Sequence, residues 1–155
     1  MHNLASLEEN AWALHRARGM ILQDSVFTRI LARELPAVIV YEDDLTFAFM
    51  DAGQLNPGHV LVATKQQVET ILDVDEDTAA ALFRTVHRVA RAVQAAFEPE
   101  GLTILQANKP AGWQTVPHLH VHVVPRYPDD GVGLVWPRKN PPLEELRRIA
   151  EKIKI

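Results

Sequence analysis

Residues 118–124 read His-Leu-His-Val-His-Val-Val, and this run constrains the fold more than any other part of the chain. Histidines alternate with aliphatic residues along it, and successive side chains of a β-strand point to opposite faces. One face of the predicted strand therefore carries a row of imidazoles: His118, His120 and His122. The other face carries an aliphatic row: Leu119, Val121 and Val123. We expect the aliphatic row to face a core and the imidazoles to exchange protons near neutral pH.

The remaining hydrophobic patterning predicts an α+β domain with an antiparallel sheet around one long helix. That helix is expected over residues 75–97, where apolar residues recur at steps of three and four. Strands are expected at residues 38–41, 45–50, 59–63, 102–106 and 116–125. A capping box at residues 6–9 predicts an N-terminal helix that ends near Gly19, and an amphipathic pattern predicts a final helix over about residues 142–154.

Composition limits the classes of protein that this chain can belong to. Its 155 residues suit a single domain, and the net charge of −4 argues against general affinity for nucleic acid or anionic membranes. The absence of cysteine excludes disulfides, thiolate zinc sites and a cysteine nucleophile. We find neither a signal-peptide pattern nor an apolar stretch of membrane-spanning length, and so we expect a cytoplasmic protein.

The imidazole row favours chemistry on a ligand of several atoms, because alternate residues of a strand lie roughly 6–7 Å apart. A neutral imidazole is a competent nucleophile toward phosphorus, and a nucleotidylated histidine divides one difficult transfer into two easier steps. The middle ring would react while the outer rings donate hydrogen bonds to phosphoryl oxygens or to a leaving group. Gln114 and Thr115, just before the row, can also donate to phosphate, although loop residues of these types are common without that role.

Two other interpretations of the histidine row stay open from the residues alone. Three histidines at this spacing could be structural core residues, which would be unusual in a chain with seven histidines. They could instead bind a metal ion, which would need further ligands from elsewhere in the chain. Cysteine is absent, and the next acidic residue after the row is Asp129.

The row matches a known pattern, His-φ-His-φ-His-φ-φ with φ hydrophobic, at all seven positions. An upstream segment, residues 56–62, reads Asn-Pro-Gly-His-Val-Leu-Val. Together these segments resemble the histidine triad (HIT) superfamily of nucleotide hydrolases and transferases. The resemblance covers about residues 25–137, and residues 1–24 look like a helical extension. It implies a single HIT-like domain with a five-stranded antiparallel sheet, and a homodimer.

The resemblance also implies the roles of the site residues. Four histidines correspond to the catalytic ones: His120, His122, His118 and His59. His120 is the nucleophile, His122 lies near the phosphate, and His118 helps to orient the middle ring. Four further residues correspond to substrate-binding positions: Gln114, Thr115, Asp51 and Asn108. Asp51 would bind the ribose hydroxyls, and Asn108 lies one position from the family's polar contact, which falls on Ala107.

The chain departs from the family pattern at a structural zinc site. Many members carry two cysteines near the N-terminus and a histidine after the second conserved strand. The matching positions here are Ser25, Thr28 and Gln67, and so we expect no bound metal and no cofactor. Trp113 stands where members usually have glycine.

The resemblance implies an enzyme that releases a nucleoside 5′-monophosphate through a covalent nucleotidyl-histidine intermediate. Its substrate would be a dinucleoside polyphosphate or a nucleoside phosphoramidate, and the residues flanking the triad look slightly more like the polyphosphate branch. Two alternatives are a nucleotide-binding module with little turnover that acts through protein contacts, and a metallohydrolase with His118, His120 and His122 as ligands. The expected partners are a purine nucleotide and a second copy of the chain, without nucleic acid or membrane.

Overall fold

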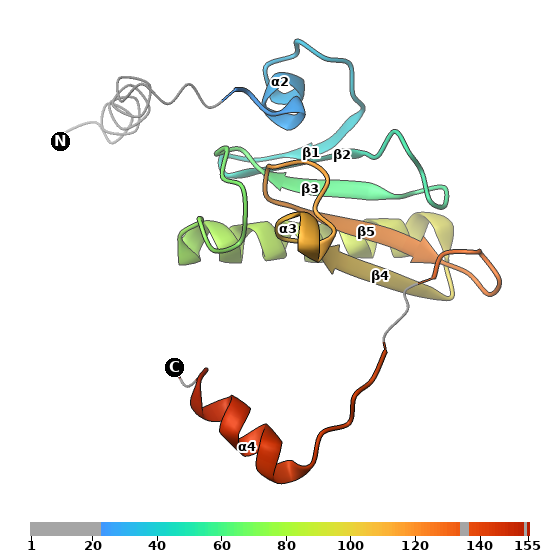
Figure 1. The fold of residues 1–155 in the computed structure, drawn as a ribbon. Helices are drawn as coiled ribbons and strands as arrows, with labels where there is room; N and C mark the ends of the chain where they lie inside the picture. Colours follow the sequence, from blue (N-terminus) through green and yellow to red (C-terminus); the bar gives the residue numbers. More distant parts are fainter. Residues whose placement is uncertain (1–22, 134–136, 154) are drawn as a thin grey trace, which may run out of the picture.

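The structure is a computed structural model that describes residues 23–133, 137–153 and 155 (Figure 1). The expected helix over residues 6–19 lies outside the described residues. In chain order the elements are α2 (Val26–Leu31), β1 (Ile39–Glu42), β2 (Thr46–Met50), β3 (Val60–Thr64), α3 (Glu76–Phe97), β4 (Gly101–Gln106), the 3₁₀ turn η1 (Pro110–Gly112), β5 (His120–Arg126) and α4 (Leu143–Glu151).

The strands form one five-stranded sheet in the order β1-β2-β3-β5-β4, and each neighbouring pair is antiparallel. The α+β prediction, with an antiparallel sheet and one long helix, is therefore confirmed. The histidine strand β5 lies between β3 and β4, where Leu61 pairs with His122 and Ala63 with His120. Both of its edges are hydrogen-bonded, and so its side chains are held in a fixed register.

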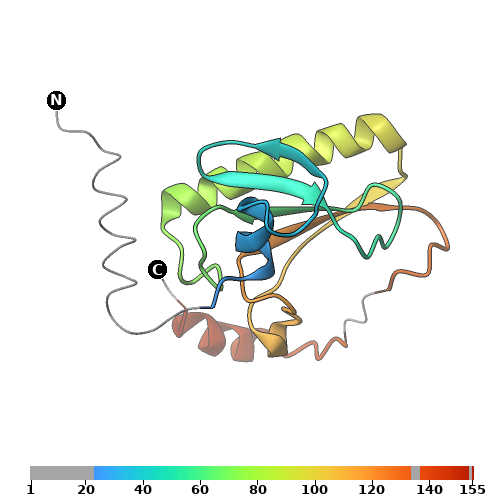
Figure 2. The ribbon, with the colours of Figure 1, turned by 90° about the horizontal axis from the view of Figure 1, so that it is seen from above.

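Side-chain alternation divides the core between the two faces of the sheet. The aliphatic row of β5 packs with α3, whose contributing residues are Leu82, Val86, Val89 and Val93. The opposite face packs against α2 through Phe27 and Ile30, which contact Phe47 and Phe49 of β2. Figure 2 shows α3 and α2 on either side of the sheet. The imidazoles therefore share their face with α2, while their apolar neighbours form the core under α3.

The long helix begins and ends with recognisable capping groups. The Asp75 side chain accepts a hydrogen bond from the Thr78 backbone N–H at 2.8 Å, and Glu76 and Asp77 place negative charge in the first turn. Glu98 ends the helix in the left-handed conformation. Phe97, in the last turn, lies against Gly58: a Cβ atom built on that glycine would be 2.7 Å from the Phe97 ring.

Three features differ from the expectations. The regular strand starts at His120 instead of residue 116, because the chain turns through a His118 N–H to Val116 carbonyl hydrogen bond of 2.8 Å. Helix α2 was not anticipated, and its six residues are too few to show a helical period. Helix α4 forms where expected, but it has no buried residue and lies apart from the sheet in Figure 1.

Among the described residues, no helix has the length and apolar character needed to cross a bilayer.

Candidate active site

A hydrogen bond to the backbone fixes the tautomer of His120. Its Nδ1 lies 2.6 Å from the backbone carbonyl oxygen of His118. A carbonyl only accepts, so Nδ1 carries the ring proton and Nε2 is the unprotonated nitrogen. Burial lowers the pKa of His120, although the bond to the His118 carbonyl and the charge of Asp51 oppose that effect. His120 therefore presents a neutral ring, and no described residue forms a hydrogen bond with its Nε2.

His118 is fixed at both nitrogens. Its Nε2 lies 2.6 Å from the Thr64 carbonyl oxygen, and its Nδ1 lies 2.6 Å from the Ser25 hydroxyl oxygen. Because the carbonyl must accept, Nε2–H donates to it and Nδ1 accepts the Ser25 proton. The ring is fully buried, and burial is the main reason that its pKa falls to about 4. His118 is thus a neutral anchor whose own carbonyl orients His120.

The three positions that correspond to zinc ligands in relatives form a hydrogen-bond network. The Thr28 hydroxyl and the Ser25 backbone N–H both donate to Gln67 Oε1, at 2.6 and 2.9 Å. The Thr28 backbone N–H donates to Ser25 Oγ at 3.0 Å. The donor set lacks a thiolate, and both nitrogens of His118 are already used, so these residues do not fit a structural zinc ion. The network instead fastens α2 to the sheet.

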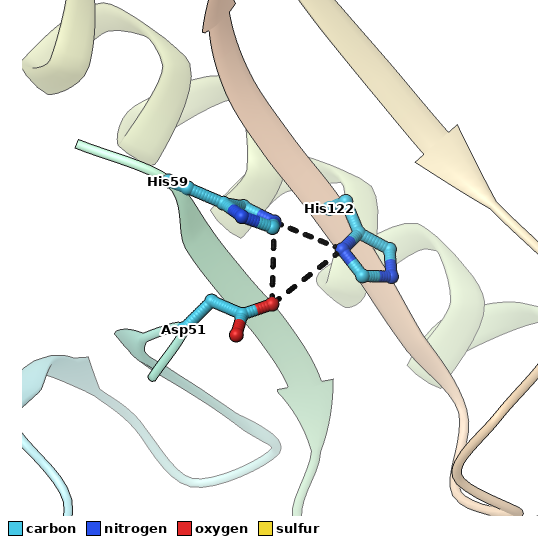
Figure 3. Close-up of side chains that lie close together, drawn as sticks. All are labelled: Asp51, His59 and His122. Carbon is cyan, nitrogen blue, oxygen red and sulfur yellow. Dashed lines mark hydrogen bonds and ion pairs between the residues drawn. The ribbon is translucent and has the colours of Figure 1, made fainter. Parts of the chain in front are cut away.

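Asp51, His59 and His122 form a second cluster, shown in Figure 3. His59 Nε2 lies 2.9 Å from His122 Nδ1. Asp51 Oδ2 lies 3.4 Å from His59 Nε2 and 4.0 Å from His122 Nδ1. Its other oxygen, Oδ1, accepts from the Gly53 backbone N–H at 2.7 Å. The backbone N–H of Leu55 is 3.4 Å from His59 Nδ1, which therefore accepts and leaves the ring proton on Nε2.

Burial keeps this histidine pair neutral. It is the largest cause of the lowered pKa of His59 and of the fall in the pKa of His122 to about 4. Repulsion between protonated rings would lower the pKa of His122 further if His120 or His59 took up a proton, and Asp51 opposes the shift in both His59 and His122. The ring centres of His120 and His122 are 5.1 Å apart, so the second cluster adjoins the proposed nucleophile.

The four residues predicted to bind substrate have different surroundings in the structure. Asp51 lies beside His59 and His122, as described above. The Gln114 side chain is buried, with its oxygen accepting from the Lys109 backbone N–H and its nitrogen donating to the Glu69 carbonyl, both at 2.7 Å. Asn108 Oδ1 accepts from the Ile71 backbone N–H at 2.8 Å. These two amides hold loops together, whereas Thr115 is exposed.

Sequence reasoning missed one aromatic neighbour of the histidines. Phe27 of α2 lies with its ring centre 4.9 Å from that of His120 and 5.6 Å from that of His118. It shields both imidazoles from water and so contributes to their lowered pKa values. No motif indicates this residue, because its helix is short and lies more than ninety residues before the strand that it covers.

Comparison with known proteins agrees with this geometry. A family model described as "HIT domain" matches residues 32–129. This chain belongs to the HIT family. Among its HIT relatives, "Protein hit" of Bacillus subtilis is 38% identical over 115 residues, which cover 74% of this chain and 79% of that protein. The crystal structure of a HIT-family member from Bacillus subtilis has a TM-score of 0.80 and 36% identity, covering 84% of this chain and 95% of that one.

Some HIT relatives carry the name of an activity and a substrate class. The adenosine 5′-monophosphoramidase hnt1 of Schizosaccharomyces pombe is 29% identical over 129 residues, which cover 83% of this chain and 94% of that protein. The purine nucleoside phosphoramidase of Escherichia coli (strain K12) is 32% identical over 103 residues. The match covers 66% of this chain and 87% of that enzyme.

Proposed function

We propose that this HIT protein is a nucleotide hydrolase that works through a nucleotidyl-His120 intermediate. The observation that carries the proposal is the Nδ1–H of His120 held by the His118 carbonyl, which leaves Nε2 with a free lone pair. That nitrogen attacks the α-phosphorus of the substrate, a P–N bond forms, and the bond to the leaving group breaks. The leaving group departs with a proton taken from solvent. Water then attacks the same phosphorus, the bond to His120 breaks, and the water returns a proton to solvent as the nucleoside 5′-monophosphate and neutral His120 are released.

The second cluster supports the same reaction. His122 lies beside His120 and receives a hydrogen bond from His59, so its Nε2 carries a proton that can be donated to a phosphoryl oxygen. Asp51 Oδ2 lies next to this pair and is free to accept from ribose hydroxyls. Thr115 is exposed and able to contact the leaving group, while Gln114 and Asn108 shape the loops around it.

The substrate class that we propose is a purine nucleoside phosphoramidate or a dinucleoside polyphosphate. The relatives named as phosphoramidases favour the former, whereas the residues flanking the triad resemble the latter. The reaction needs no metal ion or other cofactor supplied by the protein. We further propose that the enzyme acts as a homodimer in the cytoplasm.

A substrate panel with a trapping step tests the proposal. Adenosine 5′-phosphoramidate and diadenosine polyphosphates are incubated with the protein, and release of AMP is followed by chromatography. Intact mass spectrometry under alkaline quench should detect an adenylylated chain, because a P–N bond to histidine is labile in acid. His120→Ala should lack the adduct and lose at least about 1000-fold in rate. His87→Ala, at an exposed position on α3, is the matched control.

The same experiment distinguishes the alternatives. A folded wild type that binds AMP but releases none from any substrate would indicate a binding module. Full activity in a folded His120→Ala variant would contradict the nucleophile assignment. A metallohydrolase built on the histidine row is disfavoured by the structure, because both nitrogens of His118 and one of His120 are already hydrogen-bonded.

A further inference from the structure

Asp51, His59 and His122 bring three potential metal-ligand atoms close together, a property that the proposed reaction does not use. Among the described residues, this is the one group of histidine and acidic side chains whose three ligand atoms all lie within 4.8 Å of one another. The atoms Asp51 Oδ2, His59 Nε2 and His122 Nδ1 form a triangle with sides of 2.9, 3.4 and 4.0 Å (Figure 3).

These separations are close to those of a tetrahedral zinc site. Bonds of about 2.0–2.2 Å from zinc to nitrogen or oxygen place neighbouring ligand atoms about 3.3–3.5 Å apart. To surround such an ion, two of the three separations must change by about half an ångström, and the two rings must turn so that their nitrogens point at the ion and no longer at each other. Two imidazoles and one carboxylate are a ligand set that zinc accepts while keeping a fourth position for water.

The backbone holds the three ligands at fixed places. Asp51 directly follows β2, and its backbone N–H donates to the His59 carbonyl at 3.1 Å. His122 lies in the middle of β5, opposite Leu61 of β3. His59 is buried, whereas the Asp51 and His122 side chains are 22% and 24% exposed, which gives an ion a path from solvent. The triangle is thus pre-organised and accessible.

We propose that Asp51, His59 and His122 form a reversible inhibitory site for a zinc-like divalent cation. Binding would replace the hydrogen bond between the two rings, with the proton of His59 moving from Nε2 to Nδ1. A proton on His59 Nδ1 would break the 3.4 Å hydrogen bond that this atom accepts from the Leu55 N–H. The loss of that bond weakens binding of the ion and so favours reversible occupancy. Inhibition rests on the proposed function, because the ion would occupy Asp51 Oδ2, the atom assigned to the ribose hydroxyls. Imidazole-rich sites of this kind select Zn²⁺ over Mg²⁺.

Binding is tested without turnover. Zn²⁺ is titrated into the full chain by calorimetry, and Co²⁺ is added separately because tetrahedral cobalt absorbs strongly in the visible range. We expect one ion per chain, an intense cobalt band and no effect of Mg²⁺. Asp51→Asn and His122→Gln should each weaken Zn²⁺ binding by at least about 100-fold, since even the loss of an outer hydrogen-bond partner costs 10–100-fold. His87→Gln, on exposed α3, should bind as the wild type does.

The outcomes separate the two proposals. Wild-type Zn²⁺ affinity in folded Asp51→Asn and His122→Gln would place the ion elsewhere and overturn this inference. The inference would also be overturned if Co²⁺ gave no intense visible absorption of the kind that tetrahedral cobalt shows. Displacement of AMP by Zn²⁺ in the wild type, with the zinc-binding capacity of AMP itself subtracted, would support inhibition. If Zn²⁺ binds as expected but no nucleotide is hydrolysed, the metal site stands and the proposed reaction fails.

Discussion

At the scale of single residues, the chemistry of the site depends on which nitrogen of each imidazole carries the proton. The Thr64 carbonyl sets the proton on Nε2 of His118, and the His118 carbonyl sets the proton on Nδ1 of His120. These neighbouring histidines thus have opposite tautomers. One becomes a structural anchor and the other a nucleophile, although both occupy the same face of the same segment.

Replacing Ser25 by alanine should lower kcat more than it changes KM. Its hydroxyl donates to His118 Nδ1 and accepts from the Thr28 backbone N–H, so its loss leaves a buried ring nitrogen unpaired and costs about 1–3 kcal/mol of unfolding free energy. The looser His118 carbonyl then orients His120 less well. Steady-state kinetics and urea unfolding measure both effects. The control is Thr28→Val, which keeps the hydrogen bond between Ser25 and His118 and should therefore keep the wild-type kcat. Ser25→Thr, which retains a hydroxyl at position 25, should have a kcat close to that of the wild type. An unchanged kcat in Ser25→Ala would refute the positioning role.

Asp51 should determine the preference for ribose over 2′-deoxyribose. With Oδ1 bonded to the Gly53 N–H, Oδ2 remains to accept from the sugar, and the loss of one hydroxyl costs about 1–3 kcal/mol at a charged acceptor. Calorimetry with AMP and 2′-deoxy-AMP should show discrimination in the wild type and little in Asp51→Ala. Equal discrimination in both proteins would assign the ribose contact to another group, such as Asn108 or the main chain.

At the scale of elements, the connection between β2 and β3 fixes where His59 enters the site. Gly58 there has a φ of +101°, a conformation that residues with a Cβ atom rarely adopt, and it packs against Phe97 at the end of α3. One glycine therefore allows the last turn of the long helix to approach the start of β3 closely.

Gly58→Ala should lower the unfolding free energy by about 1–3 kcal/mol, through backbone strain and contact with the Phe97 ring. Thermal and urea unfolding measure the change. The same substitution in a Phe97→Ala background removes the contact but keeps the strain, so its cost should be smaller without disappearing. A Gly58→Ala variant as stable as the wild type would show that neither effect operates.

The sequence predicted the elements whose patterns are local. The histidine strand, the other four strands and α3 follow from alternation and helical period, within a few residues at their ends. Helix α2 is too short to show a period, and the start of β5 depends on hydrogen bonds from Leu119 to Val68 and from Thr64 to Leu119. The pairing of His59 with His122 likewise depends on the register of β3 against β5, which no local pattern encodes.

The loop amides make contacts that their positions in the motif do not predict. Gln114 and Asn108 have side chains suited to phosphate or sugar, and their positions in the motif favoured that role. In the structure their polar atoms bond to the backbone of residues 69–71 and 109, contacts that only the folded chain reveals. The roles of all the site residues stay predictions.

At the scale of the whole molecule, buried neutral histidines should make stability depend on pH. His118 has a pKa of about 4 in the folded protein and about 6.5 when unfolded, so below pH 6.5 the unfolded chain binds a proton that the folded chain does not. The unfolding free energy should therefore fall by about 2 kcal/mol for His118 alone between pH 7 and pH 5. Urea unfolding at several pH values measures the slope, which should be smaller in His118→Gln. A flat profile would contradict this account.

The protein should form a homodimer in dilute solution. Within the described structure, β1 and β4 are the outer strands of the sheet, and α4 exposes Leu143, Leu146 and Ile149. Pairing or covering such surfaces with a second copy would remove an open edge and apolar area from water. Light scattering at micromolar concentration should give twice the chain mass of 17.4 kDa. A monomeric mass would contradict the prediction.

The hydrogen-bond network around His118 also affects how this chain can diverge. Ser25, Thr28 and Gln67 satisfy one another, so a mutation at one position leaves the others with a lost partner, and the effects of single mutations will not add. A descendant that acquired one metal-binding residue here would first lose stability and gain nothing. The three positions are therefore expected to be inherited together, as one epistatic unit.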